Sequence, residues 1–490
     1  MNDPDTLASL AAQALETGEE EQAIPLLGAG AEQFQSALLW QWTGLLERSI
    51  DEHEQALRSF GQATRLAPGD AKIAQGCAQT ALEAGLPAVD LFESALRLVP
   101  NSGAVLMGLV AARAAAGDGE RAAADLGAVL ESQPLWIEGH EQYAQLVATL
   151  GKPGQATQTL EEAIRRTPGE AVLWESLLRI ALRRGAYESL KAILDRARGA
   201  VADRPAFAFY DAVHAAEAAD ALRPPALFEG VPGGLQPALA VWQVRHLLRL
   251  GAVGAALPII DQGLAGPQAA ELWPYAATAW RLADDPRAEW LEGDPRLVQI
   301  TDLAAGLPPL DELAGTLRSL HVARGEYLDQ SVRGGTQTDG PLLSRIDPVI
   351  RQMRRAIAGA VRQYLGALPP VDPMHPLLRY RRDRRVRFAG SWSVRLRSRG
   401  RHSNHVHPQG WISSALYIAL PKRQECEPED AGWLTLGVPD DGLGLDLGSR
   451  QRIEPRPAQL VLFPSWMWHG TRPFVEGERL TVAFDVRPPI

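Results

Sequence analysis

The sequence predicts a multidomain α + β protein, in which an all-α repeat solenoid precedes a small β-barrel with flanking helices. Three observations lead to this fold class. The chain has 490 residues, more than one ordinary domain needs. Its first part repeats turn residues at a regular interval, and its last part contains short apolar runs separated by reversals. Two or three domains are therefore expected.

Regularly spaced prolines and glycines define the repeats. Pro68, Pro100, Pro134 and Pro168 recur at a nearly constant interval. A glycine follows each of these prolines at the same distance, at Gly85, Gly117, Gly151 and Gly185, and Gly18 and Asp51 extend this series backwards. A period of about 34 residues, with a turn in mid-repeat and a proline after the second helix, is typical of tetratricopeptide repeats. We expect five to six repeats in a solenoid over residues 1–203.

Each repeat is predicted to form two amphipathic helices, for example over residues 71–83 and 88–98. One helix pair cannot bury its apolar face alone, so the array gains its core by stacking. Two roles stay open for it. The array either supports or dimerises the C-terminal domain, or it holds a peptide or protein segment on its concave face.

Residues 204–298 keep a helical character while the period blurs, with helices expected over 248–257 and 270–282. This region is interpreted as degenerate repeats or a helical bridge. A C-terminal domain is predicted over residues 299–490, with helices at 313–320 and 346–365 packed outside its barrel.

Three histidines in the C-terminal domain suggest a metal site. The chain has only ten histidines, yet His405 and His407 stand two positions apart and His469 follows at the end of a later apolar run. If His405-Val406-His407 opens a strand, the two imidazoles share one face. Neutral imidazole suits iron, copper, nickel or zinc. The His-x-His pair alone does not identify the metal, because such pairs also occur in zinc hydrolases and cupins.

Arg479 adds a fixed cation ten positions after His469. Residues 459–470 read as an apolar strand that ends near His469, and residues 479–486 read as a returning strand after the reversal at 476–478. The alternation of a strand puts Arg479 and Thr481 on one face. A guanidinium can bind a carboxylate at two points, so this pattern favours an organic dicarboxylate beside the metal.

The C-terminal part, from about position 300 to the end, resembles the 2-oxoglutarate–iron(II) oxygenases. The motifs that carry the resemblance are Ser-Trp-Ser-Val at 391–394, His-Val-His-Pro at 405–408, the run 413–417, Leu-Phe-Pro-Ser at 462–465 with His469, Arg479, and the upstream Gly-Thr-Gln-Thr at 335–338. The tail is also similar to aspartyl/asparaginyl β-hydroxylases, with Asp485-Val486 six positions after Arg479. The resemblance implies a double-stranded β-helix (jelly-roll), Fe(II), 2-oxoglutarate as cosubstrate, and hydroxylation or a related oxidation.

The chain departs from the commonest pattern of such enzymes, which bind iron through His-x-Asp/Glu and a distal His. Here His407 stands in place of the carboxylate. One hypothesis is that His407 is a ligand, which gives three neutral imidazoles. The other is that His405 and His469 bind the metal alone and water fills the third position. We favour ligation by His407, because a neighbour on the same face is already aimed at the ion.

Three aromatic residues are further candidates for the site. Tyr417, on the next apolar strand, is expected to donate its hydroxyl to 2-oxoglutarate. Trp411, four positions from His407, and Trp392 are candidates for the substrate pocket.

Ten arginines and one acid lie between Arg379 and Arg401. A basic face of this kind would suit nucleic acid or an acidic substrate. We favour a solvated face or one that pairs with the acidic solenoid. The net charge of −10 also disfavours nucleic acid as a partner.

Composition sets the remaining expectations. The two cysteines, Cys77 and Cys426, lie far apart, which fits a reducing cytoplasm and argues against a disulfide framework. The sequence shows neither a basic leader nor a long apolar run, so we expect neither a signal peptide nor a membrane span.

The sequence as a whole predicts a cytoplasmic 2-oxoglutarate-dependent dioxygenase. It would hydroxylate an amino-acid side chain in a peptide or protein that is bound partly by the repeats, with Fe(II), 2-oxoglutarate and optionally ascorbate. The alternatives are a small-molecule oxygenase and a repeat scaffold with an inactive barrel.

Overall fold

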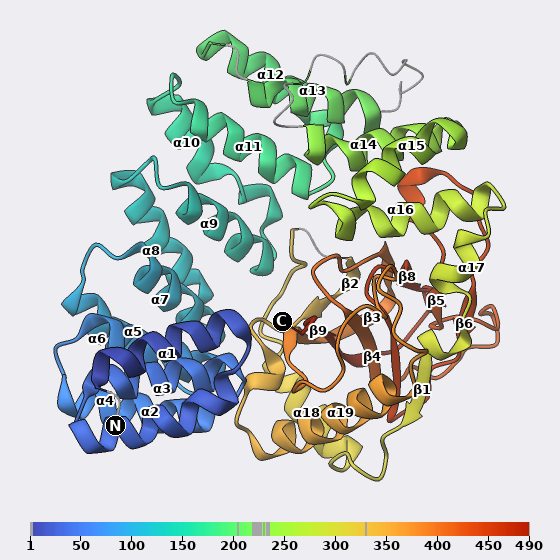
Figure 1. Ribbon diagram of the computed structural model, residues 1–490. Coiled ribbons are helices and arrows are strands. Elements are labelled where there is room, and N and C mark those ends of the chain that lie inside the picture. The colour runs from blue at the N-terminus through green and yellow to red at the C-terminus, as the bar shows by residue number, and fades with distance from the viewer. Residues whose placement is uncertain are drawn as a thin grey trace.

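A helical array curves along one side of a β-barrel and continues over its top (Figure 1). This is a computed structural model, which describes residues 3–202, 205–217, 228, 231, 236–328 and 331–489. Among these residues, helices predominate up to position 292, and the strands follow from position 299 onwards. The predicted fold class, a solenoid followed by a jelly-roll-like barrel, is confirmed.

The described residues up to position 200 form six helix pairs, in agreement with the expected five to six repeats. The helices are α1 (Pro4–Thr17), α2 (Glu20–Phe34), α3 (Ala37–Ser49), α4 (His53–Leu66), α5 (Ala71–Glu83), α6 (Val89–Leu98), α7 (Gly103–Ala115), α8 (Gly119–Ser132), α9 (Ile137–Thr149), α10 (Gln158–Arg166), α11 (Ala171–Arg183) and α12 (Tyr187–Ala200), with the short 3₁₀ helix η1 (Pro153–Gln155) before α10. Their small residues let the helices approach closely. At Gly108, for instance, a Cβ atom would lie 2.1 Å from a ring carbon of Phe92.

The periodic glycines form the turn inside each helix pair. Their φ angles are positive, between 65° and 83°, at Gly18, Gly85, Gly117, Gly151 and Gly185, and Asp51 takes the same left-handed conformation with φ 63°. Glycine adopts this conformation without a steric cost, which is why it recurs just after the first helix of a pair. We call these six positions the inner turns.

The bridge continues the helical pattern with α13 (Pro205–Glu217), α14 (Gln236–Arg249), α15 (Val253–Leu264), α16 (Ala269–Leu282) and α17 (Arg287–Glu292). The helix expected over 270–282 is confirmed as α16. The helix expected over 248–257 is wrong, because one helix ends before Gly251, which has φ 69°, and another starts after it. The domain boundary predicted between residues 203 and 204 lies outside the described residues, and the one between 298 and 299 stays a prediction.

The barrel is one curled sheet in which every paired strand is antiparallel, in the order β1-β7-β4-β9-β3-β8-β5-β6, with β2 added to β3. Its strands are β1 (Gln299–Asp302), β2 (Val332–Gln337), β3 (Phe388–His405), β4 (Ile412–Ala419), β5 (Leu434–Leu436), β6 (Gln451–Ile453), β7 (Gln459–Pro464), β8 (His469–Thr471) and β9 (Arg479–Val486). Short 3₁₀ helices occur at η4 (Pro295–Leu297), η5 (Leu342–Ser344) and η6 (Asp441–Leu443).

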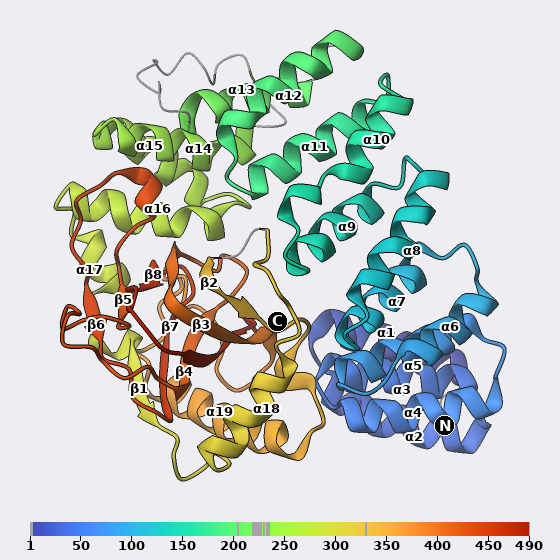
Figure 2. The ribbon, with the colours of Figure 1, turned by 180° about the vertical axis from the view of Figure 1, so that it is seen from behind.

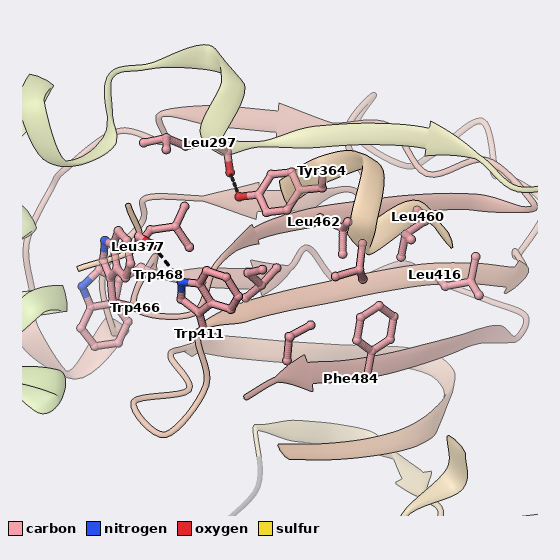
Figure 3. Packing of buried hydrophobic residues seen from close by; sticks show 14 of the residues in the cluster. Leu297, Tyr364, Leu377, Trp411, Leu416, Leu460, Leu462, Trp466, Trp468 and Phe484 are labelled. Carbon is pink, nitrogen blue, oxygen red and sulfur yellow. Dashed lines mark hydrogen bonds between the residues drawn. The ribbon is translucent and has the colours of Figure 1, made fainter. Parts of the chain in front are cut away.

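Two helices cover the outside of the sheet, as predicted: α18 (Leu310–Leu320) and α19 (Pro348–Ala367). The close view of this layer shows leucines of β4 and β7 facing Tyr364 of α19 (Figure 3). The Tyr364 hydroxyl donates a hydrogen bond of 2.7 Å to the Leu297 carbonyl, so the one polar atom of this buried side chain is satisfied.

The barrel contacts the array chiefly through the inner turns. Arginine side chains of the barrel domain reach the carbonyl oxygens of three inner turns, and a backbone amide reaches the end of α9. These contacts are Arg387 to Gly18 (3.4 Å), Arg354 to Asp51 (2.6 Å), Arg345 to Gly85 (3.5 Å) and the Arg324 amide to Thr149 (2.8 Å). The last carbonyls of a helix lack partners inside the helix and carry partial negative charge, so cationic donors stabilise them.

Ion pairs reinforce the same interface. Arg387 makes a bidentate pair with Glu20, whose side chain is buried, and Arg385 pairs with Glu52. The expectation that the basic run pairs with the acidic solenoid is therefore confirmed for these arginines.

The bridge holds the opposite side of the barrel, as the view from behind shows for α16 and α17 beside β5 and β6 (Figure 2). The indole of Trp468 donates to the Pro274 carbonyl at 3.0 Å, and Arg450 pairs with the buried Glu292 at 3.0 Å. None of the described helices is long and apolar enough to cross a membrane.

We predict that Arg387→Ala detaches the first repeat from the barrel. The substitution leaves the buried Glu20 carboxylate without its cation, which should destabilise this contact by roughly 2–4 kcal/mol. Hydrogen–deuterium exchange in α1 and α2 should become faster. Arg381→Ala is the matched control, since Arg381 is exposed and its one ion pair within the described residues is with nearby Asp383. Unchanged exchange in α1 and α2 of the Arg387 variant would contradict the prediction.

Candidate metal centre

Three histidines meet inside the barrel. His405 is the last residue of β3 and lies opposite His469, the first residue of β8. His407 follows in the connection to β4, so His-x-His closes a strand and does not open one, contrary to the expectation. The imidazoles nevertheless converge, because the ligand atoms of the three side chains lie within 4.8 Å of one another.

Hydrogen bonds fix the orientation of two of these rings. His405 Nδ1 lies 2.8 Å from the Ser403 carbonyl, and His469 Nδ1 lies 3.0 Å from the Met467 carbonyl. Since a carbonyl only accepts, each Nδ1 carries the hydrogen, and each neutral ring keeps its lone pair on Nε2. Burial lowers the pKa of His405 to about 3 and the pKa of His469 well below its usual range. Both rings are therefore neutral and ready to bind a metal.

The third ring is held by a carboxylate. Asp485 accepts from His407 Nδ1 at 2.6 Å, and its other oxygen accepts from the Ser413 hydroxyl at 2.6 Å. Asp485 is 8 % exposed, so water screens the electrostatic interaction between its carboxylate and the imidazole only weakly. Trp392 stacks on a face of His407, with ring centroids 5.5 Å apart. These contacts leave Nε2 of His407 available as a ligand.

Alternate residues of β9 line the same cavity: Arg479, Thr481, Ala483 and Asp485. Arg479 is 2 % exposed and pairs with no carboxylate among the described residues. Its Nε and the Tyr417 hydroxyl, both buried, have no hydrogen-bond partner in the described part of the chain. The Tyr417 ring lies 5.1 Å from the guanidinium carbon.

The unpaired guanidinium is the strongest electrostatic feature of the cavity. Burial lowers the pKa of Arg479, which reflects the cost of holding this charge away from water. A buried cation without a carboxylate partner among the described residues, next to a buried tyrosine hydroxyl, fits an anionic ligand with a carboxylate end. The arrangement therefore suits 2-oxoglutarate.

Two polar residues at the cavity were not expected from the sequence. The Ser331 hydroxyl lies 3.1 Å from both His402 Nδ1 and His405 Nε2. Burial also lowers the pKa of His402 well below its usual range. The contact joins the segment before β2 to β3, so no local pattern could have indicated it. Asp485, in contrast, shares the strand face of Arg479 at even spacing, and this alternation was available in the sequence.

The two tryptophan candidates lie in different places. Trp392 lines the cavity. Trp411 does not: it is 4 % exposed in the layer between sheet and helices, and its indole donates to the Leu377 carbonyl at 3.0 Å (Figure 3). The prediction that Trp411 lines the substrate pocket is therefore wrong, because the residue points to the opposite side of the sheet.

A comparison with protein families shows what the barrel is similar to. Residues 390–485 match the family model described as "Putative 2OG-Fe(II) oxygenase". The chain therefore joins an array of helix pairs to a domain that is similar to this oxygenase family. The matched segment contains His405, His407, His469 and Arg479, so the family implies Fe(II) and 2-oxoglutarate for this cavity. The likeness to aspartyl/asparaginyl β-hydroxylases stays a prediction.

Several solved structures are similar to a part of the chain at low TM-scores. MamA of Desulfovibrio magneticus RS-1 is 13 % identical, and the alignment covers 33 % of this chain and 93 % of MamA at a TM-score of 0.30. YrrB, a TPR protein with an unusual peptide-binding site, is 21 % identical over 35 % of this chain and 90 % of its own, at 0.25. A Pseudomonas putida prolyl-4-hydroxylase is 17 % identical over 42 % of this chain and 96 % of its own, at 0.27. No curated protein matches this chain.

We predict that Asp485→Asn weakens metal binding. The amide cannot supply the negative charge that the carboxylate gives to His407, and losing such a partner of a metal-binding histidine typically lowers affinity about 10- to 100-fold. Titration of the metal-free protein with Co(II), followed by its visible spectrum, measures the change. Asp383→Asn, at an exposed carboxylate, is the control. Equal affinity of Asp485→Asn and the parent protein would contradict the prediction.

Proposed function

We propose that the protein is a 2-oxoglutarate- and Fe(II)-dependent dioxygenase that hydroxylates an amino-acid side chain in a peptide or protein. One observation carries the proposal: three imidazoles with fixed Nδ1–H groups converge beside a buried arginine that has no anion of its own among the described residues. The imidazoles suit a divalent iron ion, and the arginine suits a dicarboxylate.

His405, His407 and His469 would hold the iron. Ligation by His407 is favoured over a water in the third position, because Asp485 holds its Nδ1 and leaves Nε2 free. Three neutral imidazoles alone would leave the full charge of the ion uncompensated. Asp485 supplies one negative charge next to the metal. This charge would partly compensate that of the ion, as a directly bound carboxylate does in the commoner sites.

Arg479, Tyr417 and Thr481 would bind the far carboxylate of 2-oxoglutarate. Nε of Arg479 and the Tyr417 hydroxyl, which lack a hydrogen-bond partner among the described residues, would gain one in this way. Thr481 faces the same cavity from β9. Bound iron and 2-oxoglutarate together supply the activation of O₂, and the protein holds them in place and excludes water.

Trp392 forms part of the wall of the cavity. Its ring covers one face of His407, while the ring of Phe463 lies 4.8 Å from the ring of His469. These aromatic groups make the surroundings of the imidazoles apolar. A substrate C–H bond would then approach from the side that these rings leave open.

Two alternative functions can be distinguished from this proposal by experiment. A small-molecule oxygenase would turn over 2-oxoglutarate with no protein substrate. An inactive repeat scaffold is disfavoured by the intact histidines and Arg479, and it would form no succinate. A need for ascorbate and a cytoplasmic location remain predictions from the sequence.

Iron-dependent formation of succinate from 2-oxoglutarate is the direct test of the activity, and His469→Ala should abolish it because one ligand is lost. The same inactive variant can retain its substrates in a pull-down. Treating the captured proteins with active enzyme should add the mass of one oxygen atom, detected by mass spectrometry. Equal succinate formation by the parent protein and His469→Ala would exclude the proposal.

We further predict that Arg479→Ala raises the dissociation constant for 2-oxoglutarate while the metal still binds. Losing a two-point contact to a desolvated carboxylate costs several kcal/mol, roughly a hundredfold in affinity. Arg479→Lys should recover only part of it, because an ammonium group lacks the planar fork. Calorimetric titration of the iron-loaded protein without oxygen measures both. Unchanged affinity in Arg479→Ala would refute the role of this residue.

A further inference from the structure

At the inner turns of the fourth and sixth helix pairs, Gly117 and Gly185, a Cβ atom would meet no atom of the barrel domain. The inner turns of the first, second, third and fifth helix pairs contact the barrel domain. At Gly185, the turn of the sixth pair, a Cβ atom would meet only Tyr187 of the array itself. Next to this turn, a cleft of about 630 Å³ lies between the array, which lines it with Gly151, Pro153 and Arg184, and the strands β2 and β3. Ligand sites of proteins typically have volumes in this range.

Three exposed arginines face the cleft without a partner. Arg184 comes from the array, Arg324 from the segment before β2, and Arg397 from β3. No side-chain hydrogen bond or ion pair is formed by any of the three within the described residues. The acid of the cleft, Glu326, is already engaged, since it accepts from the Gly334 amide at 2.7 Å.

This situation differs from that of the other interface arginines, such as Arg385 and Arg387, which are paired with glutamates of the array. The chain as a whole has a net charge of −10. A local group of unpaired cations in an acidic protein attracts an anionic partner selectively. The cleft therefore has the charge of a docking site for an anion.

The cleft and the histidine cavity share one pair of strands. Arg333 and Thr336 of β2 line the cleft, whereas Ser331 and Gln337, close to them in the chain, line the cavity. Across the strand pair, Val332 lies opposite His402 of the cavity. The cleft and the histidine cavity therefore lie only a few residues apart along β2, where an extended chain advances about 3.3 Å per residue.

We propose that this cleft binds an acidic segment of the peptide or protein substrate, a few residues away from the side chain that is oxidised. The proposal rests on the proposed function and adds the substrate class. Guanidinium groups bind carboxylates with two parallel hydrogen bonds. Both walls of the cleft supply guanidinium groups. Nucleic acid is the less suitable occupant, because tight binding to it generally uses about 6–10 phosphate contacts.

Fluorescence anisotropy of a labelled peptide of alternating glutamate and glycine tests the docking site, in the absence of iron and 2-oxoglutarate. The parent protein should bind this peptide more tightly than the glutamine–glycine counterpart, and salt should weaken binding. The double variant Arg324→Glu/Arg397→Glu should raise the dissociation constant roughly tenfold or more.

The matched control is Arg355→Glu/Arg362→Glu, which reverses two exposed arginines of α19 that line another cleft. This control should bind the glutamate peptide like the parent protein. Equal loss in both double variants, no preference for glutamate over glutamine, or tighter binding of a single-stranded oligonucleotide would overturn the proposal. Because no turnover is involved, these results are independent of succinate formation, which tests the oxygenase assignment separately.

Discussion

Hydrogen bonds from barrel arginines to the carbonyl ends of repeat helices unite the two parts of this protein. The last carbonyls of a helix need donors from outside, and a charged donor contributes about 1.5–3 kcal/mol. The left-handed inner turns present these carbonyls at each repeat, as at Gly18, Asp51 and Gly85. The first three repeats therefore contact the barrel at the same position of the repeat.

This constraint explains how charge is distributed over the molecule. Part of the basic run before and along β3 is neutralised by array glutamates, including the buried Glu20. Inside the barrel the balance is different: Asp485 is the carboxylate beside the histidines, and Arg479 has no anion among the described residues. The protein holds an unpaired cation in a buried cavity, an arrangement that becomes favourable when an anionic cosubstrate binds.

Most of the correct predictions of structure from the sequence came from periodic residue patterns. The repeats followed from prolines and glycines, and Arg479 and Thr481 on one strand face followed from the alternation of β9. Trp411 failed because closeness in sequence to His407 does not determine the side of the sheet. The Arg354–Asp51 contact, between two residues from opposite parts of the chain, has no local signal at all.

The site shows the same division between local and distant information. His405 and His469 were identifiable by type and spacing, and their pairing across β3 and β8 brings them together. The partners of their rings are backbone carbonyls, which every residue has and no sequence pattern marks. The Ser331 contact depends on the added strand β2, which the sequence alone does not pair with β3.

The central claim is that three imidazoles, including that of His407, hold one iron ion in this barrel. X-ray absorption at the iron edge of the anaerobically loaded protein tests it most directly, because multiple scattering counts the imidazole rings around the metal. The account predicts three rings in the parent protein and two in His407→Ala. Two rings in both proteins would contradict it.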